Sequence, residues 1–264
     1  MLHDARLINF IANSLALLAV SALLVGAVVW VAQRPYFVIS TLRLAPIEEG
    51  SDLRFVTASS LGEAIKDKLR GNFFFIDLDE TRRLIETTPW VRHARVQRVW
   101  PNALAVYVEE HQPLALWNEN EMINTWGEAF QAYAAELPEG VDLPHLKGPD
   151  DSERLVVQRY AEVARWFAPL NLRVDELTLS PRYAWEMTLS DGMRLTLGRD
   201  PAADIADPHG RSGALPFAAR IERFVEAWPR LVQSMNGRAI AHADLRYPNG
   251  FAITLAPVTP TPSN

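Results

Sequence analysis

The chain has 264 residues, of which 48% are hydrophobic and 22% charged, so its composition is that of a globular protein rather than a disordered one. Its formal net charge of −6 argues against a dedicated nucleic-acid-binding protein, because neutralising phosphates needs clustered Lys and Arg. The chain contains no cysteine, which excludes disulfides, thiolate catalysis and cysteine-based zinc sites.

The N-terminal part of the chain is predicted to cross a membrane. Residues 7–33 contain no charged side chain and are rich in Leu, Ala and Val. A helix of this length, at about 1.5 Å per residue, can cross roughly 30 Å of hydrocarbon. A cleaved signal peptide is the alternative, but its apolar core usually spans only about 7–15 residues, and this run continues past a weak cleavage site at residues 19–21. We therefore favour an uncleaved anchor, preceded by a short tail of residues 1–6.

The residues that flank this segment indicate an interface but leave its orientation open. Trp30, Tyr36 and Phe37 stand where an interfacial belt of aromatic side chains is expected. On the short side Asp4 offsets Arg6, whereas several arginines follow the span. The excess of positive charge that normally marks the cytoplasmic side therefore does not decide which end is cytoplasmic.

After the anchor, residues 37–44 are predicted to form a strand, and residues 45–50 a long acidic loop. Thr57 is expected to cap a helix that runs to about Leu69, because apolar residues recur every four positions along it. A second helix is expected to begin near Asp79, whose side chain can cap it, and to end before Pro89.

A β-hairpin is predicted next, formed by Val91–Val99 and Ala103–Glu110 around a turn at Pro101 and Asn102. Apolar and more polar residues alternate along its second strand. This period of two is typical of a strand with one buried face and one face in water.

The rest of the chain reads as a second domain, residues 112–257. Strands are expected around residues 113–117, 122–124 and 174–179, and a hairpin at residues 185–189 and 193–197. Asp191-Gly192 between the last two is typical of a type I′ turn. Two helices are expected to pack on this sheet, the first capped by Ser152 and the second spanning residues 215–228.

The C-terminal part ends in two further strands. Residues 240–246 and 251–255 flank a turn at residues 247–250, and the second of them is the expected edge of the sheet. Residues 199–213 are polar and rich in Gly and Pro, which indicates a loop of no assignable role. The proline-rich tail 258–264 is predicted to be disordered.

No pattern for catalysis or cofactor binding emerges from the chain. Asp204, Asp207 and His209 could form a cluster of hard ligands, but three donors on a polar loop are far more often solvated, so we predict no metal site. Glu109 and Glu110 are adjacent on a strand and point to opposite faces, so they cannot act as an acid–base pair. We therefore predict no cofactor and no enzymatic activity.

The sequence resembles the FtsQ/DivIB family of bitopic bacterial cell-division proteins. The resemblance is carried by residues of fixed type at fixed spacing, namely Pro89-Trp90-Val91, Val96, Arg98, Trp100-Pro101-Asn102, Leu104, Val106, Val108, Glu110, Pro113 and Trp117. It is supported further along by Leu197-Gly198-Arg199, by Arg220-Ile221 with Phe224, and by Asp244-Leu245-Arg246-Tyr247.

This resemblance implies an α+β protein with an N-terminal transmembrane helix at residues 7–33. A POTRA domain (polypeptide-transport-associated, β-α-α-β-β) would then occupy residues 37–111, and a mixed α/β domain with a mainly antiparallel sheet residues 112–257. It also implies a single-pass protein of the inner membrane at the division septum, with a cytoplasmic N-terminus and periplasmic domains.

The family's function, carried over to this chain, is the assembly of the division machinery. Its members bind the division proteins FtsB and FtsL through the second domain, and connect early and late division proteins. Because residues 251–255 are the expected edge of the sheet, we expect such a partner to bind by adding a strand to this last β-strand. By position the partner-binding residues would be Arg199, Arg246, Tyr247, Gly250 and Leu255. Many family members have an aromatic residue in place of Leu255, so the contact there is expected to differ.

Two other classes of function are kept as alternatives. A membrane-anchored periplasmic enzyme would need a cleft with converging polar groups. A secretion or chaperone component of POTRA type would normally carry several POTRA repeats or a β-barrel, and the sequence indicates a single unit and no barrel strands.

Overall fold

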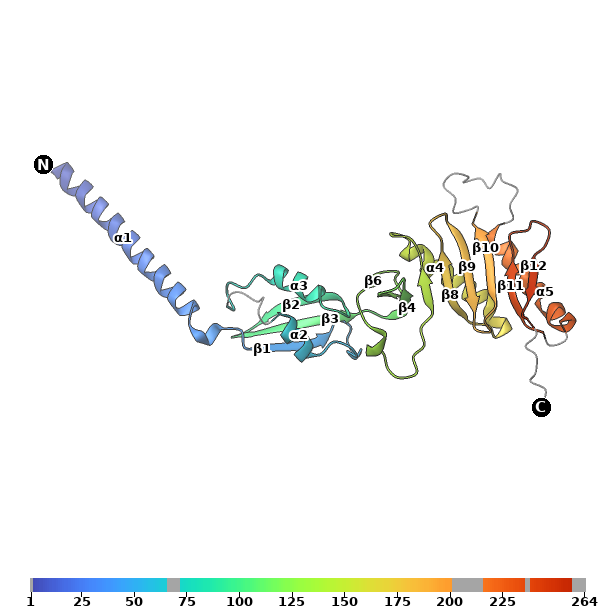
Figure 1. The fold of residues 1–264 in the computed structure, drawn as a ribbon. Helices are drawn as coiled ribbons and strands as arrows, with labels where there is room; N and C mark the ends of the chain where they lie inside the picture. The colour runs from blue at the N-terminus through green and yellow to red at the C-terminus, as the bar shows by residue number, and fades with distance from the viewer. Residues whose placement is uncertain (1, 66–71, 201–215, 236–237, 258–264) are drawn as a thin grey trace. The chain divides into compact units, whose positions relative to one another are not determined.

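The computed structural model describes residues 2–65, 72–200, 216–235 and 238–257 (Figure 1). By its contacts the chain divides into two compact units, Met1–Glu110 and His111–Asn264. Three expected features lie outside the described residues, either wholly or in large part: the end of the first soluble helix at Leu69, the loop 199–213 beyond Asp200, and the tail 258–264.

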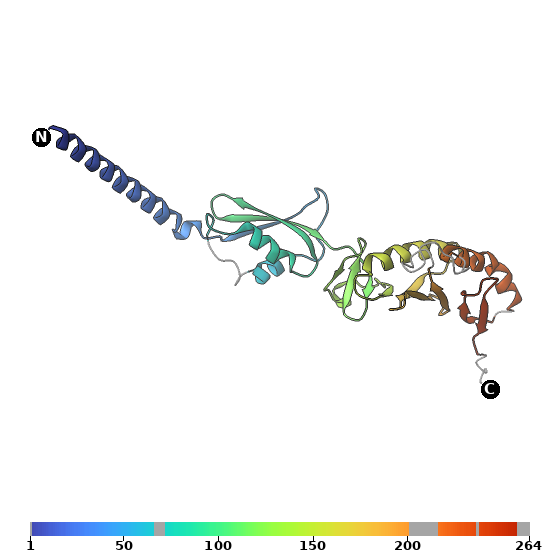
Figure 2. The same ribbon diagram turned by 90° about the horizontal axis from the view of Figure 1, so that it is seen from above.

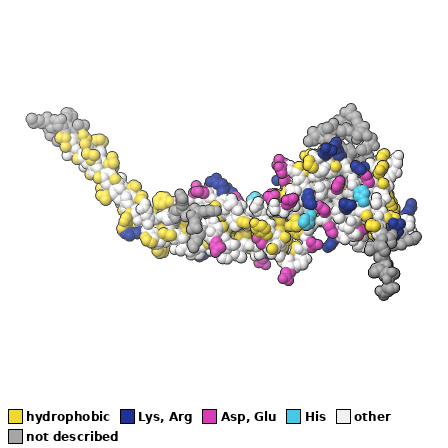
Figure 3. All heavy atoms as spheres, viewed as in Figure 1, with side chains coloured by type: hydrophobic (Ala, Val, Ile, Leu, Met, Phe, Trp, Pro, Cys, Tyr) yellow, Lys and Arg dark blue, Asp and Glu magenta, His cyan; other side chains and the backbone are white. Residues whose placement is uncertain are grey.

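The chain begins with a long apolar helix, α1 (Leu2–Ala32). Within it Ile8–Ala32 spans 25 residues with a mean hydropathy of 2.6. Among the described residues α1 is the one helix long and apolar enough to cross a membrane. Hydrophobic side chains follow one another along the described part of α1 in the space-filling view (Figure 3). The helix therefore fits a single-pass membrane protein.

The remainder of the first unit has the order strand, helix, helix, strand, strand. Its elements are η1 (Pro35–Phe37), β1 (Thr41–Pro46), α2 (Ala58–Ile65), α3 (Leu78–Glu86), β2 (Val91–Val99) and β3 (Ala103–Glu110). The three strands form a sheet in the order β1-β3-β2, with β1 parallel and β2 antiparallel to β3. The expected hairpin and the β-α-α-β-β order are confirmed.

The central position of β3 changes one expectation about its faces. Leu104 and Val106 are fully buried, as their alternation predicts. Ala103 and Ala105, on the face expected to see water, are buried as well. A small side chain on a central strand is covered by its larger neighbours on the strands to either side, so the water-facing side of β3 is only partly open.

Three boundaries in the first unit differ from the prediction. The first strand begins at Thr41 rather than at residue 37, because Pro35–Phe37 form a 3₁₀ turn after α1. That strand also runs on through Pro46, into the stretch expected to be a loop. Asp77, not Asp79, caps α3, since its side chain accepts the N–H groups of the first helical turn.

The second unit is a sheet with two helices. Its strands are β4 (Pro113–Trp117), β5 (Glu121–Asn124), β6 (Ala129–Phe130), β7 (His145–Lys147), β8 (Val174–Leu179), β9 (Ala184–Leu189), β10 (Arg194–Arg199), β11 (Ile240–Asp244) and β12 (Ala252–Leu255). Its helices are α4 (Glu153–Phe167), α5 (Phe217–Ser234) and the short 3₁₀ segments η2 (Ala134–Glu136) and η3 (Ala168–Leu170).

The described strands of this unit form one sheet in the order β12-β11-β10-β9-β8-β7-β4-β5-β6. Most neighbours are antiparallel; the pairs β4–β7, β7–β8 and β10–β11 are parallel. Both α4 and α5 lie on the same side of the strands (Figure 2). Phe167 of α4 and Phe224 of α5 are fully buried against inward residues of the sheet such as Trp185 and Leu195. The mixed fold with a mainly antiparallel sheet is confirmed.

Several local expectations in this unit were wrong. The turn at Asp191-Gly192 is not of type I′, because only Gly192 has a positive φ, of 84°. The N–H of Gly192 instead donates to the carbonyl of Leu189, which is typical of a type I turn followed by a left-handed glycine. The hydroxyl of Ser152 donates to the carbonyl of Pro149 and does not cap α4.

The length of some elements also differs. The last helix continues through Pro229 to Ser234, six residues past its expected end. Strands β6 and β7 were not predicted, since two or three residues are too few to show a period. The final two strands are shorter than expected, with β11 ending at Asp244 and β12 beginning at Ala252.

Candidate partner-binding surface

A bulge at Gly198 gives the end of β10 its particular shape. The pairing between β9 and β10 shifts its register between Thr196 and Gly198. Gly198 has a φ of +74°, which side chains rarely adopt, and a Cβ there would lie 2.8 Å from Cγ of Arg246. Glycine at this position therefore allows both the bulge and the close passage of the Arg246 side chain.

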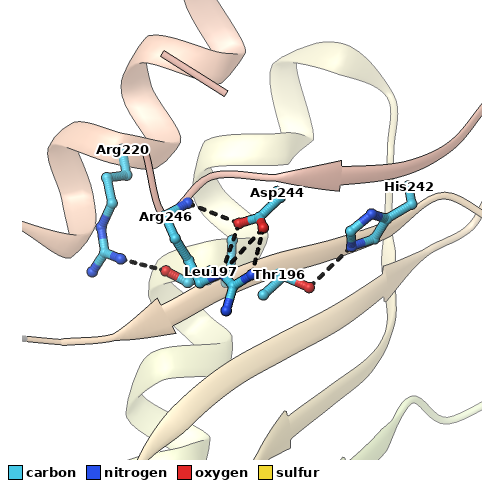
Figure 4. A network of polar contacts seen from close by, with 6 residues as sticks. All are labelled: Thr196, Leu197, Arg220, His242, Asp244 and Arg246. Carbon is cyan, nitrogen blue, oxygen red and sulfur yellow. Dashed lines mark hydrogen bonds and ion pairs between the residues drawn. The ribbon is translucent and has the colours of Figure 1, made fainter. Parts of the chain in front are cut away.

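Arg220 of α5 binds the two carbonyl groups that this bulge turns towards the helix. Its Nη1 donates to the carbonyl of Leu197 (Figure 4). Its Nη2 donates to the carbonyl of Arg199. Burial lowers the pKa of Arg220, whereas the nearby Asp200 raises it. The guanidinium is thus a buried clamp between α5 and the end of β10, and it leaves the Arg199 side chain exposed to solvent.

Arg246 is fixed by Asp244 at the end of β11. The side-chain hydrogen bonds run from Nε to Oδ1 at 2.9 Å and from Nη2 to Oδ2 at 2.6 Å (Figure 4). The hydrogen bonds from Arg246 hold the pKa of Asp244 below its usual value, and in return Asp244 raises the pKa of Arg246. The Arg246 side chain is still 62% exposed, so it is oriented and yet accessible.

The turn that follows presents Tyr247 to solvent. Tyr247 is 53% exposed, and with residues 248–252 it lines a shallow hollow on the surface. Arg223 of α5 donates to the carbonyl of Pro248 at 2.8 Å. At the end of the turn, the ring of Phe251 packs on Phe224 with centroids 5.2 Å apart. These two contacts with α5 hold the turn against the core, and Tyr247 projects from it.

Strand β12 is the last strand of the sheet among the described residues, and β11 is the one described strand that it pairs with. The N–H of Ala256 donates to the carbonyl of Ala239, so residue 256 directs its donor towards β11. Successive residues of a strand direct their N–H groups to opposite sides. Thr254 therefore also donates towards β11, whereas Ile253 directs its N–H to the side of β12 that no described strand pairs with.

The structure brings four of the five predicted residues to one end of the sheet. Strands β10 and β11 are parallel, so Arg199, the last residue of β10, and Arg246, which follows β11, lie at the same end of the sheet. Tyr247 and Gly250 belong to the adjoining turn. Leu255 lies apart, because β12 runs antiparallel to β11 and places it opposite Ile240, at the other end of the strand.

The structure gives neither Leu255 nor Gly250 a clear role in binding a partner. Leu255 is partly buried and packs against the helix-covered core, so its side chain is not directed towards a partner beside the strand. Gly250 does not have a positive φ, and a Cβ there would meet no atom within 4 Å. The structure thus gives no conformational reason for glycine at position 250.

Reasoning from the sequence missed the residues that fix this surface. The sequence motifs that contain Asp244 and Arg220 do not indicate a role for either residue. A further ion pair joins Arg159 of α4 to Asp200, directly after β10, and the Arg159 guanidinium lies 4.3 Å from the ring centroid of Phe217. Each of these contacts joins residues that are far apart in the sequence or on either side of a strand end, so no local pattern identifies them.

Other parts of the described chain offer no comparable site. The helix-free face of the sheet carries Lys, Arg, Asp, Glu and His side chains without a dominant sign (Figure 3). Among the described residues no three His, Asp or Glu side chains are placed to hold a metal ion, and Asp204, Asp207 and His209 lie outside them. Glu110 accepts hydrogen bonds from the N–H groups of residues 54–56, and Glu109 binds Arg92 at 2.6 Å. Both carboxylates therefore have structural partners.

Comparison with known proteins gives matches along almost the whole chain. Residues 115–246 match the family described as "Cell division protein FtsQ/DivIB, C-terminal", and residues 51–111 match the "POTRA domain, FtsQ-type". The chain is 59% identical over 260 residues to "Cell division protein FtsQ" of Bordetella pertussis, covering 98% of this chain and 95% of that protein. It is 42% identical over 256 residues to the protein of the same name from Burkholderia pseudomallei, covering 97% and 95% of the two chains.

Proposed function

The chain belongs to the FtsQ/DivIB family of cell division proteins, and on that premise we propose that it assembles the division machinery by offering the open edge of β12 to a partner strand. The observation that carries this proposal is the combination of an edge strand with an oriented, exposed Arg246 and an exposed Tyr247 beside it. Main-chain hydrogen bonds along the edge would each contribute about 0.5–1.5 kcal/mol, while the side chains select the partner.

The chemistry of this edge defines the partner. It should supply one extended segment that pairs with β12 and acidic side chains that meet Arg246 and Arg199. Tyr247 would contribute most among the side chains, since an exposed tyrosine that becomes buried at an interface can contribute about 2 kcal/mol or more. Proteins of the FtsB and FtsL type are the partners that we propose, together with other early and late division proteins.

We also propose that the N-terminus is cytoplasmic and that residues 37–111 and 112–257 are two periplasmic domains acting at the septum. The long apolar helix α1 and the large mass that follows it are consistent with export of the C-terminal part. A reporter enzyme that is active only outside the cytoplasm, fused after Asn264, should be active. An inactive fusion of normal abundance would contradict this orientation.

Depletion in the cell tests the proposed role itself. Loss of the protein should give long filaments with unfinished septa, and expression of the intact chain should restore division. Expression of a chain with Arg246→Glu and Tyr247→Ala should leave the filaments while still reaching the membrane in normal amount. Restored division by this double variant would argue against the edge of β12 as the partner-binding surface.

A further inference from the structure

A group of aromatic side chains lies near the C-terminal end of α1, where the rest of the first unit begins. Phe37 contacts Phe74 with ring centroids 4.9 Å apart and Trp100 with centroids 5.5 Å apart. Tyr36 packs edge-on against Phe37, and Phe74 also lies near Trp100. Despite these contacts Tyr36 is 63% and Trp100 64% exposed, and Phe75, next to Phe74 in the chain, is 61% exposed. We call Tyr36, Phe37, Phe74, Phe75 and Trp100 the aromatic rim.

The exposure of the rim is built into the structure by polar contacts beneath it. The side-chain oxygen of Asn72 accepts the N–H groups of Phe74 and Phe75, at 3.1 and 3.2 Å. Arg98 donates from Nε to the carbonyl of Phe73 at 2.8 Å and from Nη2 to the carbonyl of Ile76 at 2.6 Å. The turn is therefore held from both sides while it presents two phenylalanines to the outside.

The rim is bound to the end of α1 by the chain and by hydrogen bonds. The side-chain nitrogen of Asn72 donates to the carbonyl of Ala32, the last residue of α1, at 2.6 Å. Tyr36 follows Ala32 by four residues, which span at most about 14 Å even when fully extended. Phe73 donates from its N–H to the carbonyl of Phe37 at 2.9 Å, so the turn stays close to this connection.

This distance brings the rim to the surface of any membrane that α1 crosses. The headgroup region on each side of a bilayer is roughly 5–8 Å deep. Trp and Tyr are enriched in this region, because an aromatic body with a polar tip suits a boundary between apolar and wet surroundings. Arg34 stacks on Trp30, with Cζ 3.4 Å from the ring centroid, and adds a cation at the same level.

We infer that the aromatic rim inserts into the lipid interface of the membrane that α1 crosses, and so docks the first unit on the bilayer. The inference uses the membrane anchor of the proposed function and is independent of the edge at β12. The partner is the lipid interface itself rather than a protein, because the rim combines aromatic side chains with an unbroken covalent connection to the membrane-crossing helix. Trp100 lies at the tip of the β2–β3 hairpin and takes part through its exposed ring.

The chain has no cysteine, so a single one can be introduced and labelled with a nitroxide. Phe75→Cys places the label in the rim, and Ser51→Cys places it beyond the far end of β1, on an exposed residue. The full-length protein is reconstituted into phosphatidylethanolamine–phosphatidylglycerol vesicles. The accessibility of each label to oxygen and to a water-soluble nickel chelate is then measured by power-saturation EPR.

The label at position 75 should be several-fold more accessible to oxygen than to the nickel chelate, and the label at position 51 should show the reverse. Adding Trp100→Ser to Phe75→Cys should shift the first label towards water, while an unchanged thermal unfolding midpoint shows that the domain remains folded. Equal, water-like accessibility at both positions overturns the inference. So does an accessibility at position 75 that depends on the protein-to-lipid ratio, because it would assign the rim to a second copy of the chain.

Discussion

Asp244 and Arg246 form a two-residue ion pair across the end of β11, with Nη2 of the arginine 2.6 Å from Oδ2 of the aspartate. The aspartate side chain is only 12% exposed, whereas that of the arginine is 62% exposed. The pair therefore has a buried anchor and an accessible cation. Such a cation is pre-oriented for a partner, and less side-chain entropy is lost when it binds.

The first prediction concerns this cation and its neighbour Tyr247. Arg246→Glu should weaken binding of an FtsB-type periplasmic segment by tenfold or more, about 1.4 kcal/mol or above, because it places a second carboxylate beside Asp244 and repels an acidic partner. Tyr247→Ala should cost a similar amount through lost contact area. Isothermal titration calorimetry on the full chain in detergent measures both changes.

The matched control for these variants is Arg173→Glu. Arg173 is an exposed arginine just before β8, at the end of the sheet away from Arg199. The Arg173→Glu variant should bind the FtsB-type segment as tightly as the unaltered chain does. Equal affinity for all four proteins would remove Arg246 and Tyr247 from the interface.

The second prediction concerns the pH dependence of stability. The pKa of Asp244 is lowered in the folded state, so its contribution to the free energy of unfolding is fully present above the ordinary value near 3.9 and is lost as the pH falls through the lowered value. Asp244→Asn should therefore be less stable than the unaltered chain at pH 7. The difference should shrink below about pH 4.

Urea unfolding of the second unit, His111–Asn264, is followed by tryptophan fluorescence in the full chain and measures this difference between pH 7 and pH 3. Asp175→Asn serves as the control, because Asp175 is exposed and no hydrogen bond to its carboxylate is found among the described residues. A stability difference for Asp244→Asn that stays constant down to pH 3 would show that the hydrogen bonds from Arg246 do not lower the pKa of Asp244.

The third prediction separates two glycines at the same end of the sheet. Gly198→Ala should destabilise the second unit by about 1–3 kcal/mol, because φ is +74° there and the new Cβ would lie 2.8 Å from Cγ of Arg246. Gly250→Ala should change stability by less than about 0.5 kcal/mol, since its Cβ would meet nothing. Denaturant unfolding of the two variants gives the comparison, and similar losses for both would contradict the assigned roles.

Sequence patterns predicted those parts of the fold that local signals determine. The β2–β3 hairpin was predicted to the residue, because alternation and the Trp100-Pro101-Asn102 turn act over short distances. The helix cap was misplaced by two residues, because Asp77 and Asp79 offer the same chemistry within one turn. The hydrogen bonds that form when the helix folds decide between the two aspartates, and the residue spacing alone does not specify these bonds.

The candidate site was only partly predictable, for a related reason. Arg246 and Tyr247 were chosen by their position in a family pattern, whereas the clamp of Arg220 and the bulge at Gly198 depend on how α5 packs against β10. The aromatic rim joins residues 36–37, 74–75 and 100, which only the tertiary fold brings together. Local periodicity identifies each segment as apolar, but it does not show that they meet.

The proposed strand addition at β12 is tested most directly by proline substitution. Ile253→Pro removes an N–H that faces the open edge, where proline is tolerated, whereas Thr254→Pro removes one that faces β11. Ile253→Ala serves as the control for loss of the side chain. In each variant the affinity for the FtsB-type segment and the free energy of unfolding are measured together. We expect that Ile253→Pro abolishes binding with a modest loss of stability, that Ile253→Ala still binds, and that Thr254→Pro destabilises the sheet. Binding of Ile253→Pro with the affinity of Ile253→Ala would contradict strand addition at β12.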